Sequence, residues 1–131
     1  MKKAKRFLAL FLVLCMMVCA MALPASAYTY HFAFPSTQAN SLQHEGPEPR
    51  GTSTAYVAPD ITTISTIYYL APSESVSISA TDLVYKTTGG RSNFVWRPNY
   101  GGEGGAYYLC GCPDWNMGAH TAYISYGSWN V

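Results

Sequence analysis

A period-two alternation of apolar and polar residues runs through much of the chain. Residues 28–34 place aromatic side chains at the even positions and Thr29, His31 and Ala33 at the odd positions. Residues 75–80 alternate serine with aliphatic residues in the same way. Because successive side chains of a strand point to opposite faces, both segments are predicted to be half-buried strands.

β-Branched and aromatic residues dominate the rest of the chain after residue 27, and such side chains fit a pleated surface. Glycine, proline and aspartate cluster between the apolar runs and indicate turns. Further strands are therefore predicted at residues 52–57, 61–70, 83–88, 93–97, 105–110 and 121–129.

Two segments fit this pattern less well. Residues 61–70 repeat an apolar side chain at every third position, which also fits a helix, but six of the first seven residues are β-branched and favour a strand. Residues 38–51 hold two prolines, two glycines and few apolar residues, so they are predicted to form a long surface loop.

The predicted strands define the expected fold class. Seven or eight short strands within residues 28–131 indicate an all-β fold, either a small antiparallel β-sandwich or a barrel. The segment has the length of one domain, so a single domain is predicted at 28–131.

The first 27 residues have the pattern of a secretory signal peptide. Four of the eight basic residues fall within the first six positions, an uncharged run covers residues 7–23, and Ala25 and Ala27 supply small side chains for a signal peptidase. We expect cleavage after Ala27 and a secreted, extracellular product that meets a membrane only before cleavage. An uncleaved anchor is the alternative, since the run is close to the shortest spanning length.

The formal net charge changes when the expected signal peptide is left out of the count. Residues 28–131 carry four basic and seven acidic side chains, a formal net charge of −3. Proteins that bind nucleic acid carry basic patches that neutralise phosphates, so a nucleic-acid partner is disfavoured.

Several short segments carry a family resemblance. Residues 32–34, 38–41, 52–57 and the closing 126–129 resemble segments of small exported all-β proteins of Gram-positive bacteria, most of them uncharacterised. The tyrosine-rich ending is also similar in style to lactococcin-like bacteriocins. The first resemblance implies an exported β-sandwich without an assigned activity, and the second implies a secreted antibacterial protein acting on the cell envelope.

Cys110 and Cys112 are the only cysteines after residue 27. In an exported chain such a pair is expected to form a disulfide. Two residues of extended strand span about 6.6 Å, near the upper limit for bridged Cα atoms, so the bond requires a bend at Gly111. Pairing of the thiols between two chains is an open alternative.

A metal site is the other alternative for these cysteines. Cys110, Cys112 and His120 could supply two thiolates and an imidazole to zinc or copper, with Asp114, His31 or His44 as a fourth ligand. The familiar zinc spacings add a second cysteine pair or a second histidine nearby, and this sequence has neither. We therefore expect no metal and no cofactor.

Catalytic signatures are missing from the sequence. It contains no Gly-x-Ser-x-Gly elbow, no His-Glu-x-x-His pair and no phosphate loop. The glycine-rich residues 101–105 lack the lysine that a phosphate site requires and fit a hairpin end. The protein is therefore expected not to be an enzyme.

Aromatic content favours a binding function. Residues 28–131 contain 17 Phe, Tyr and Trp residues, more than a small core can enclose, so some are expected at the surface. Exposed tyrosine and tryptophan suit an extracellular protein or a glycan partner. The alternative is that they replace leucine in the core. The candidate binding residues are Tyr100, Tyr107, Tyr108, Trp115 and Trp129.

Overall fold

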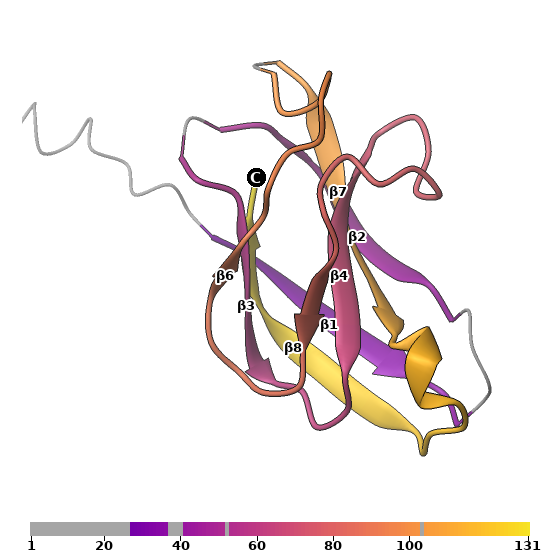
Figure 1. The fold of residues 1–131 in the computed structure, drawn as a ribbon. Coiled ribbons are helices and arrows are strands. Elements are labelled where there is room, and N and C mark those ends of the chain that lie inside the picture. The colour runs from indigo at the N-terminus through magenta and orange to yellow at the C-terminus, as the bar shows by residue number, and fades with distance from the viewer. Residues whose placement is uncertain (1–26, 37–40, 52, 103) are drawn as a thin grey trace, which may run out of the picture.

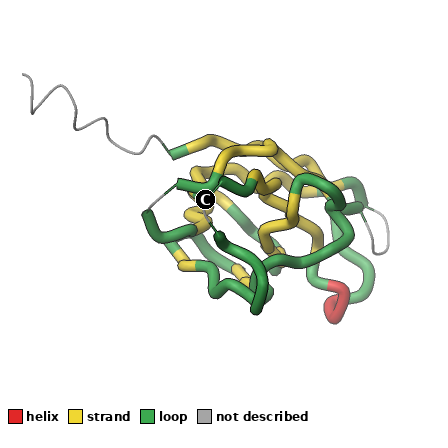
Figure 2. Tube along the Cα trace, turned by 90° about the horizontal axis from the view of Figure 1, so that it is seen from above, coloured by secondary structure: helices red, strands yellow, loops and turns green. Residues whose placement is uncertain are grey.

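Eight strands in the described residues form two four-stranded antiparallel sheets (Figures 1 and 2). The structure is a computed structural model that describes residues 27–36, 41–51, 53–102 and 104–131. The strands are β1 (Tyr28–Phe34), β2 (Gln43–Pro49), β3 (Tyr56–Ile61), β4 (Thr66–Pro72), β5 (Val84–Lys86), β6 (Ser92–Asn93), β7 (Ala106–Pro113) and β8 (Tyr123–Asn130). A single 3₁₀ turn, Trp115–Met117, lies between β7 and β8 within the described part.

The two sheets are built from strands that are distant in sequence. One has the order β1-β8-β3-β6 and the other the order β2-β7-β4-β5. The predicted antiparallel all-β fold is therefore confirmed, and of its two predicted forms, sandwich or barrel, the two sheets form a sandwich. β1 and β2 are each the edge strand of their own sheet. A hydrogen bond from the Ala33 backbone N–H of β1 to the Gln43 side chain of β2 joins these two edges.

The core lies between the sheets and follows the alternation seen in the sequence. The even positions of β1 point inward, so Tyr30, Phe32 and Phe34 are all buried. They meet the inward side chains of the other strands, with Trp129 of β8 among the largest. Gly111 of β7 makes room for this packing, because a Cβ there would lie 2.6 Å from the Phe32 ring.

Buried hydroxyl groups are paired with one another inside this aromatic core. The Tyr30 hydroxyl donates to that of Tyr68 at 3.3 Å, and Ser125 contacts both. Burial, followed by the nearby Tyr68, raises the pKa of Tyr30 well above its ordinary value. The Tyr30 hydroxyl therefore stays neutral, and the three hydroxyls satisfy each other's hydrogen bonds, as buried polar groups must.

The structure confirms some of the strands and loops predicted from the sequence and corrects others. β1 has the predicted bounds, and residues 61–70 are extended rather than helical, although a turn after Ile61 divides them between β3 and β4. The strand predicted at residues 75–80 is wrong, because this segment forms turns. The surface loop predicted at residues 38–51 is also wrong in part, since it contains β2; residues 38–40 lie outside the described residues.

β2 escapes sequence detection because it is an edge strand. Among the described strands it pairs with β7 only, and all of its residues are exposed or half-buried, so it needs no apolar alternation. Its prolines are tolerated because one side of the strand has no ladder to donate to. The register with β7 shifts between Glu45 and Glu48, which marks a bulge in the middle of the strand.

The expected signal peptide, residues 1–27, lies outside the described residues except for Ala27. β1 begins at Tyr28, so the expected cleavage would leave every strand intact. Across the described residues, no helix has the length and apolarity to cross a membrane.

Candidate functional site

The five aromatic residues expected to bind a ligand lie in different environments. Trp115 is 52% exposed, whereas Tyr100 and Tyr108 are half-buried. Tyr107 and Trp129 are buried in the core at 6% and 1% exposure, so the expectation of an exposed binding surface does not hold for these two.

Strand parity explains why the sequence prediction chose the wrong face of β8. Along this strand the odd positions, including Trp129, point into the core, and the even positions point outward. Ile124 and Tyr126 are therefore exposed at 47% and 38%. The outward aromatic residue of this strand is Tyr126, which belongs to a different surface from the predicted set.

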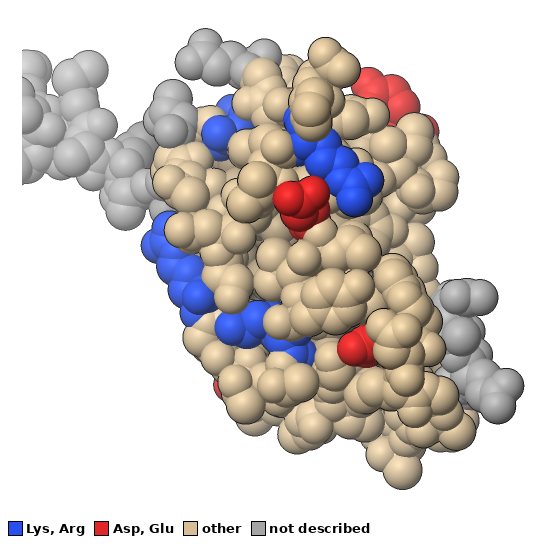
Figure 3. All heavy atoms as spheres, viewed as in Figure 1, with Lys and Arg blue, Asp and Glu red and all other residues tan. Residues whose placement is uncertain are grey.

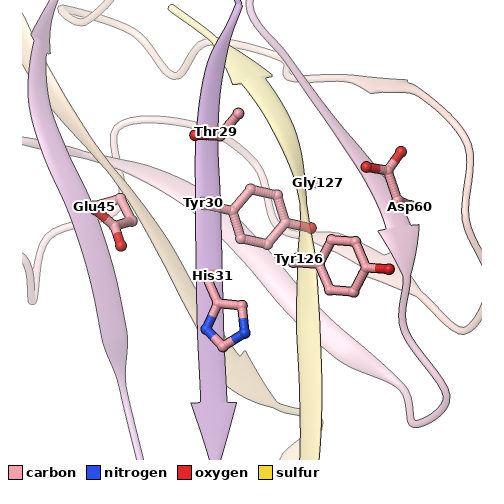
Figure 4. A pocket seen from close by; sticks show the side chains of 7 residues that line it. All are labelled: Thr29, Tyr30, His31, Glu45, Asp60, Tyr126 and Gly127. Carbon is pink, nitrogen blue, oxygen red and sulfur yellow. The ribbon is translucent and has the colours of Figure 1, made fainter.

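Tyr126 lies in a groove on the outer face of the β1-β8-β3 sheet (Figure 4). The groove has a volume of about 430 Å³, within the range of ligand pockets. Figure 4 shows Glu45 of β2 at one side and Asp60 of β3 at the other, with His31 and Tyr126 between them. The lining residues are Thr29, Tyr30, His31, Glu45, Asp60, Tyr126 and Gly127.

The floor of the groove is shaped by Gly127 and by an irregularity in β3. The register between β3 and β8 shifts between Pro59 and Ile61, next to Gly127. A Cβ at Gly127 would collide with the carbonyl oxygen of Ala58 and lie 2.8 Å from the Pro59 Cα atom. Glycine at this position therefore allows β3 to approach β8 closely and places Asp60 beside the groove.

Two rings form a small aromatic platform in the groove. His31 and Tyr126 face each other in the β1-β8 register, and their rings are nearly parallel, with centroids 6.3 Å apart and an interplanar angle of 14°. Flat rings with a polar tip suit sugar faces, cationic groups and peptide planes. The alternation in residues 28–34 did place His31 on the outer face, but no sequence signal paired it with Tyr126.

The groove is electronegative. The described residues that line it include the carboxylates of Glu45 and Asp60 and no lysine or arginine. The described basic residues lie elsewhere and contact neighbours: Arg97 with Asp82, Arg50 over Trp96, Arg91 over Tyr56, and Lys86 with Ser92. Figure 3 shows Lys and Arg in separate patches with uncharged surface between them.

The two cysteines are free thiols, so the expected disulfide is not formed in this structure. Gly111 between them pairs with Tyr68 of β4 and Gln43 of β2, and these ladders hold β7 extended on both sides. Extended backbone keeps the Cα atoms of i and i+2 positions near the upper limit for a disulfide. The bend that the bond requires is therefore not present.

Burial makes both thiols unreactive at neutral pH. It raises the pKa of Cys110 to about 12 and that of Cys112 to about 11, with the charge of Asp114 adding to the effect at Cys112. Cys112 lines a second, apolar groove of about 350 Å³ with Leu42, Tyr69, Pro113 and Trp115. The thiolate is the reactive form, so neither cysteine fits the role of a nucleophile.

The histidines named as candidate metal ligands do not gather around the two cysteines, although His44 lies opposite Cys110 in the β2–β7 register. The ring of His120 packs edge-on against Tyr123, and its Nδ1 atom lies 2.9 Å from the Thr121 carbonyl oxygen. His44 packs against Tyr108, and His31 lies in the groove. Over the part of the chain that the structure describes, no three His, Cys, Asp or Glu side chains are grouped to hold a metal ion.

The chain matches no family model, no curated protein and no solved structure. The groove that holds His31 and Tyr126 is therefore the feature from which a function can be inferred.

Proposed function

We propose that this protein is an exported, non-catalytic binding module that holds an extracellular protein or glycan in the groove of His31 and Tyr126. The observation that supports the proposal is the pair of near-parallel rings set between two carboxylates in a hollow of about 430 Å³. Aromatic faces supply contact area, and carboxylates accept hydrogen bonds or pair with cations.

Export is supported by the residues before β1. A basic start, an apolar run and small residues at Ala25 and Ala27 precede the first strand, which begins at Tyr28. A product that starts at this residue would keep the complete β1 edge of the groove.

A pair of matched variants tests the binding role. Tyr126→Ala removes the platform, whereas Tyr85→Ala removes a tyrosine of similar exposure (49%) on β5, far along the other sheet. Binding is measured by two-dimensional amide NMR and by calorimetry against capped short peptides and soluble cell-wall oligosaccharides. We expect one probe class to bind the wild type and Tyr85→Ala but not Tyr126→Ala.

Two results would count against this function. Equal binding by both variants would move the ligand site away from the groove, and the failure of both probe classes to shift any groove amide would remove the proposal. Inhibition of Gram-positive indicator cells that survives Tyr126→Ala would favour the antibacterial alternative instead.

A further inference from the structure

The outer edge of β1 is partly occupied by a side chain that imitates a neighbouring strand. The Oε1 atom of Gln43 accepts a hydrogen bond from the Ala33 backbone N–H at 3.0 Å, and its Nε2 atom donates to the Ala33 carbonyl oxygen. Both backbone groups of Ala33 therefore point away from β8, toward β2.

Along the same edge of β1, the outward-facing backbone groups of His31 and Thr29 have no partner among the described residues. In an antiparallel pair, the residues whose backbone groups face outward alternate along the strand. Since Ala33 faces outward, His31 and Thr29 do so as well, and among the described residues nothing pairs with them on that side. Both residues line the groove.

Contacts at both ends limit this open edge to a short window. Gln43 closes it at Ala33, and at the other end Glu48 lies beside the Tyr28 hydroxyl, where burial and this carboxylate raise the pKa of Tyr28. Between the two contacts, β2 carries the bulge that follows Glu45. The window from Thr29 to His31 is about 7 Å long, enough to pair with about three residues of extended chain.

We propose that this window binds a short extended peptide that adds to the edge of β1 and carries a lysine or arginine side chain beside Glu45. The proposal rests on the binding function above and names its ligand class. Unpaired strand edges are the sites at which extended peptides add to a sheet, with backbone hydrogen bonds giving affinity and side-chain pockets giving specificity.

Register and charge specify the basic side chain. Directly opposed residues of neighbouring strands share a face, so the peptide residue opposite His31 projects into the groove. That side chain lies between His31 and the carboxylate of Glu45, while Tyr126 and Asp60 lie beyond His31 on β8 and β3. The described residues that line the groove include no cationic residue to oppose it. A Lys or Arg side chain fits both the negative charge and the aromatic face.

A saccharide fits the platform but not the edge. Sugar hydroxyls could stack with and bond to the His31–Tyr126 pair, yet they do not reproduce the alternating donors and acceptors that the backbone of His31 and Thr29 presents. A peptide residue supplies one N–H and one C=O at the matching spacing. The peptide is therefore the ligand that uses the whole groove.

Four capped five-residue peptides test the proposal on the purified protein by calorimetry. The first has a central lysine between threonines and alanines, the second a central glutamate, and the third an N-methyl group on the lysine amide, which removes one donor. The fourth probe has the lysine peptide's composition with D-residues. We expect the lysine peptide to bind and each of the other three to bind at least about tenfold more weakly.

Protein variants separate the charge contribution from the edge contribution. Glu45→Gln should abolish the preference for lysine over glutamate at the central position, whereas Glu74→Gln, a change of the same charge on an exposed turn outside the groove, should leave it unchanged. Binding of the N-methyl peptide equal to that of the lysine peptide would overturn the edge pairing. Binding of a soluble oligosaccharide in place of every peptide, lost in Tyr126→Ala, would overturn this inference and leave the binding function standing.

Discussion

Replacing Gly127 by alanine perturbs the backbone packing that shapes the groove. A methyl group at this position would collide with the Ala58 carbonyl oxygen and lie 2.8 Å from the Pro59 Cα atom and 2.9 Å from the Asp60 nitrogen. These three atoms belong to the backbone of β3, so no side-chain rotation relieves the contact. β3 must move away from β8, and the side of the groove formed by Asp60 must move with it.

The expected loss of stability follows from this contact. Overpacking of a well-packed site costs about 1–3 kcal/mol, and a rigid backbone neighbour places Gly127→Ala in the upper half of that range, at about 2–3 kcal/mol. For a domain of about one hundred residues, each kcal/mol lowers Tm by about 4–8 °C. A fall in Tm of about 8–24 °C is expected.

Urea denaturation followed by tryptophan fluorescence measures the effect, with Gly102→Ala as the matched control. A Cβ at Gly102 has no heavy atom within 4 Å, so this variant should keep the wild-type midpoint. If Gly127→Ala unfolds within about 0.5 kcal/mol of the control, a value usual for surface changes, the close approach of β3 and β8 is refuted.

Three further predictions concern the surface, the thiols and the N-terminus. Tyr126→Ala should lose binding in the groove. Its unfolding free energy in urea titrations should stay within about 1 kcal/mol of that of Tyr85→Ala, because both side chains are exposed. A larger loss of stability would make Tyr126 a structural residue. Because burial raises the pKa of Cys112 from 9.0 to about 11, the unfolded chain loses this proton first, and the unfolding free energy should fall as pH rises from about 9 to about 11. The rate of alkylation by iodoacetamide should be low at pH 8 and should rise over the same pH interval, and reduction should leave the intact mass unchanged. Fast alkylation at pH 8, or a gain of about 2 Da on reduction, would contradict free, buried thiols. N-terminal sequencing of exported protein should begin at Tyr28, and recovery of a membrane-bound chain beginning at Met1 would refute the cleaved signal.

The parts of the fold that bury an alternating face could be predicted from the sequence. β1 has the predicted bounds because Tyr30, Phe32 and Phe34 must all point to one side, and this pattern fixes both its register and its inward face. β8 follows the same rule, although its strand runs from Tyr123 rather than from residue 121.

The parts decided by tertiary pairing could not be predicted. β2 has almost no apolar residue and exists because β7 offers it a ladder, which the local sequence does not reveal. Residues 75–80 have a clear alternation but form turns, with the Ala80 N–H bonded to Leu70 and the Tyr69 hydroxyl bonded to Val76. Local periodicity therefore gives a preference that long-range hydrogen bonds can override.

The groove was beyond sequence prediction for a related reason. His31, Glu45, Asp60 and Tyr126 come from four strands, and only the order β1-β8-β3 and the contact between the edges of β1 and β2 bring them together. The high content of aromatic residues indicated that some of them would be exposed at the surface. Which tyrosine is exposed depends on strand parity, and the candidate Trp129 was one position out of phase with the outer face.

Amide chemical-shift mapping with the capped central-lysine peptide is the most direct test of the binding groove. The largest shifts are expected on Thr29, His31 and Tyr126, with protection of the His31 amide from solvent exchange when the peptide pairs with it. Shifts gathered instead around Leu42 and Trp115, two residues of the apolar groove beside Cys112, would contradict binding in the groove of His31 and Tyr126.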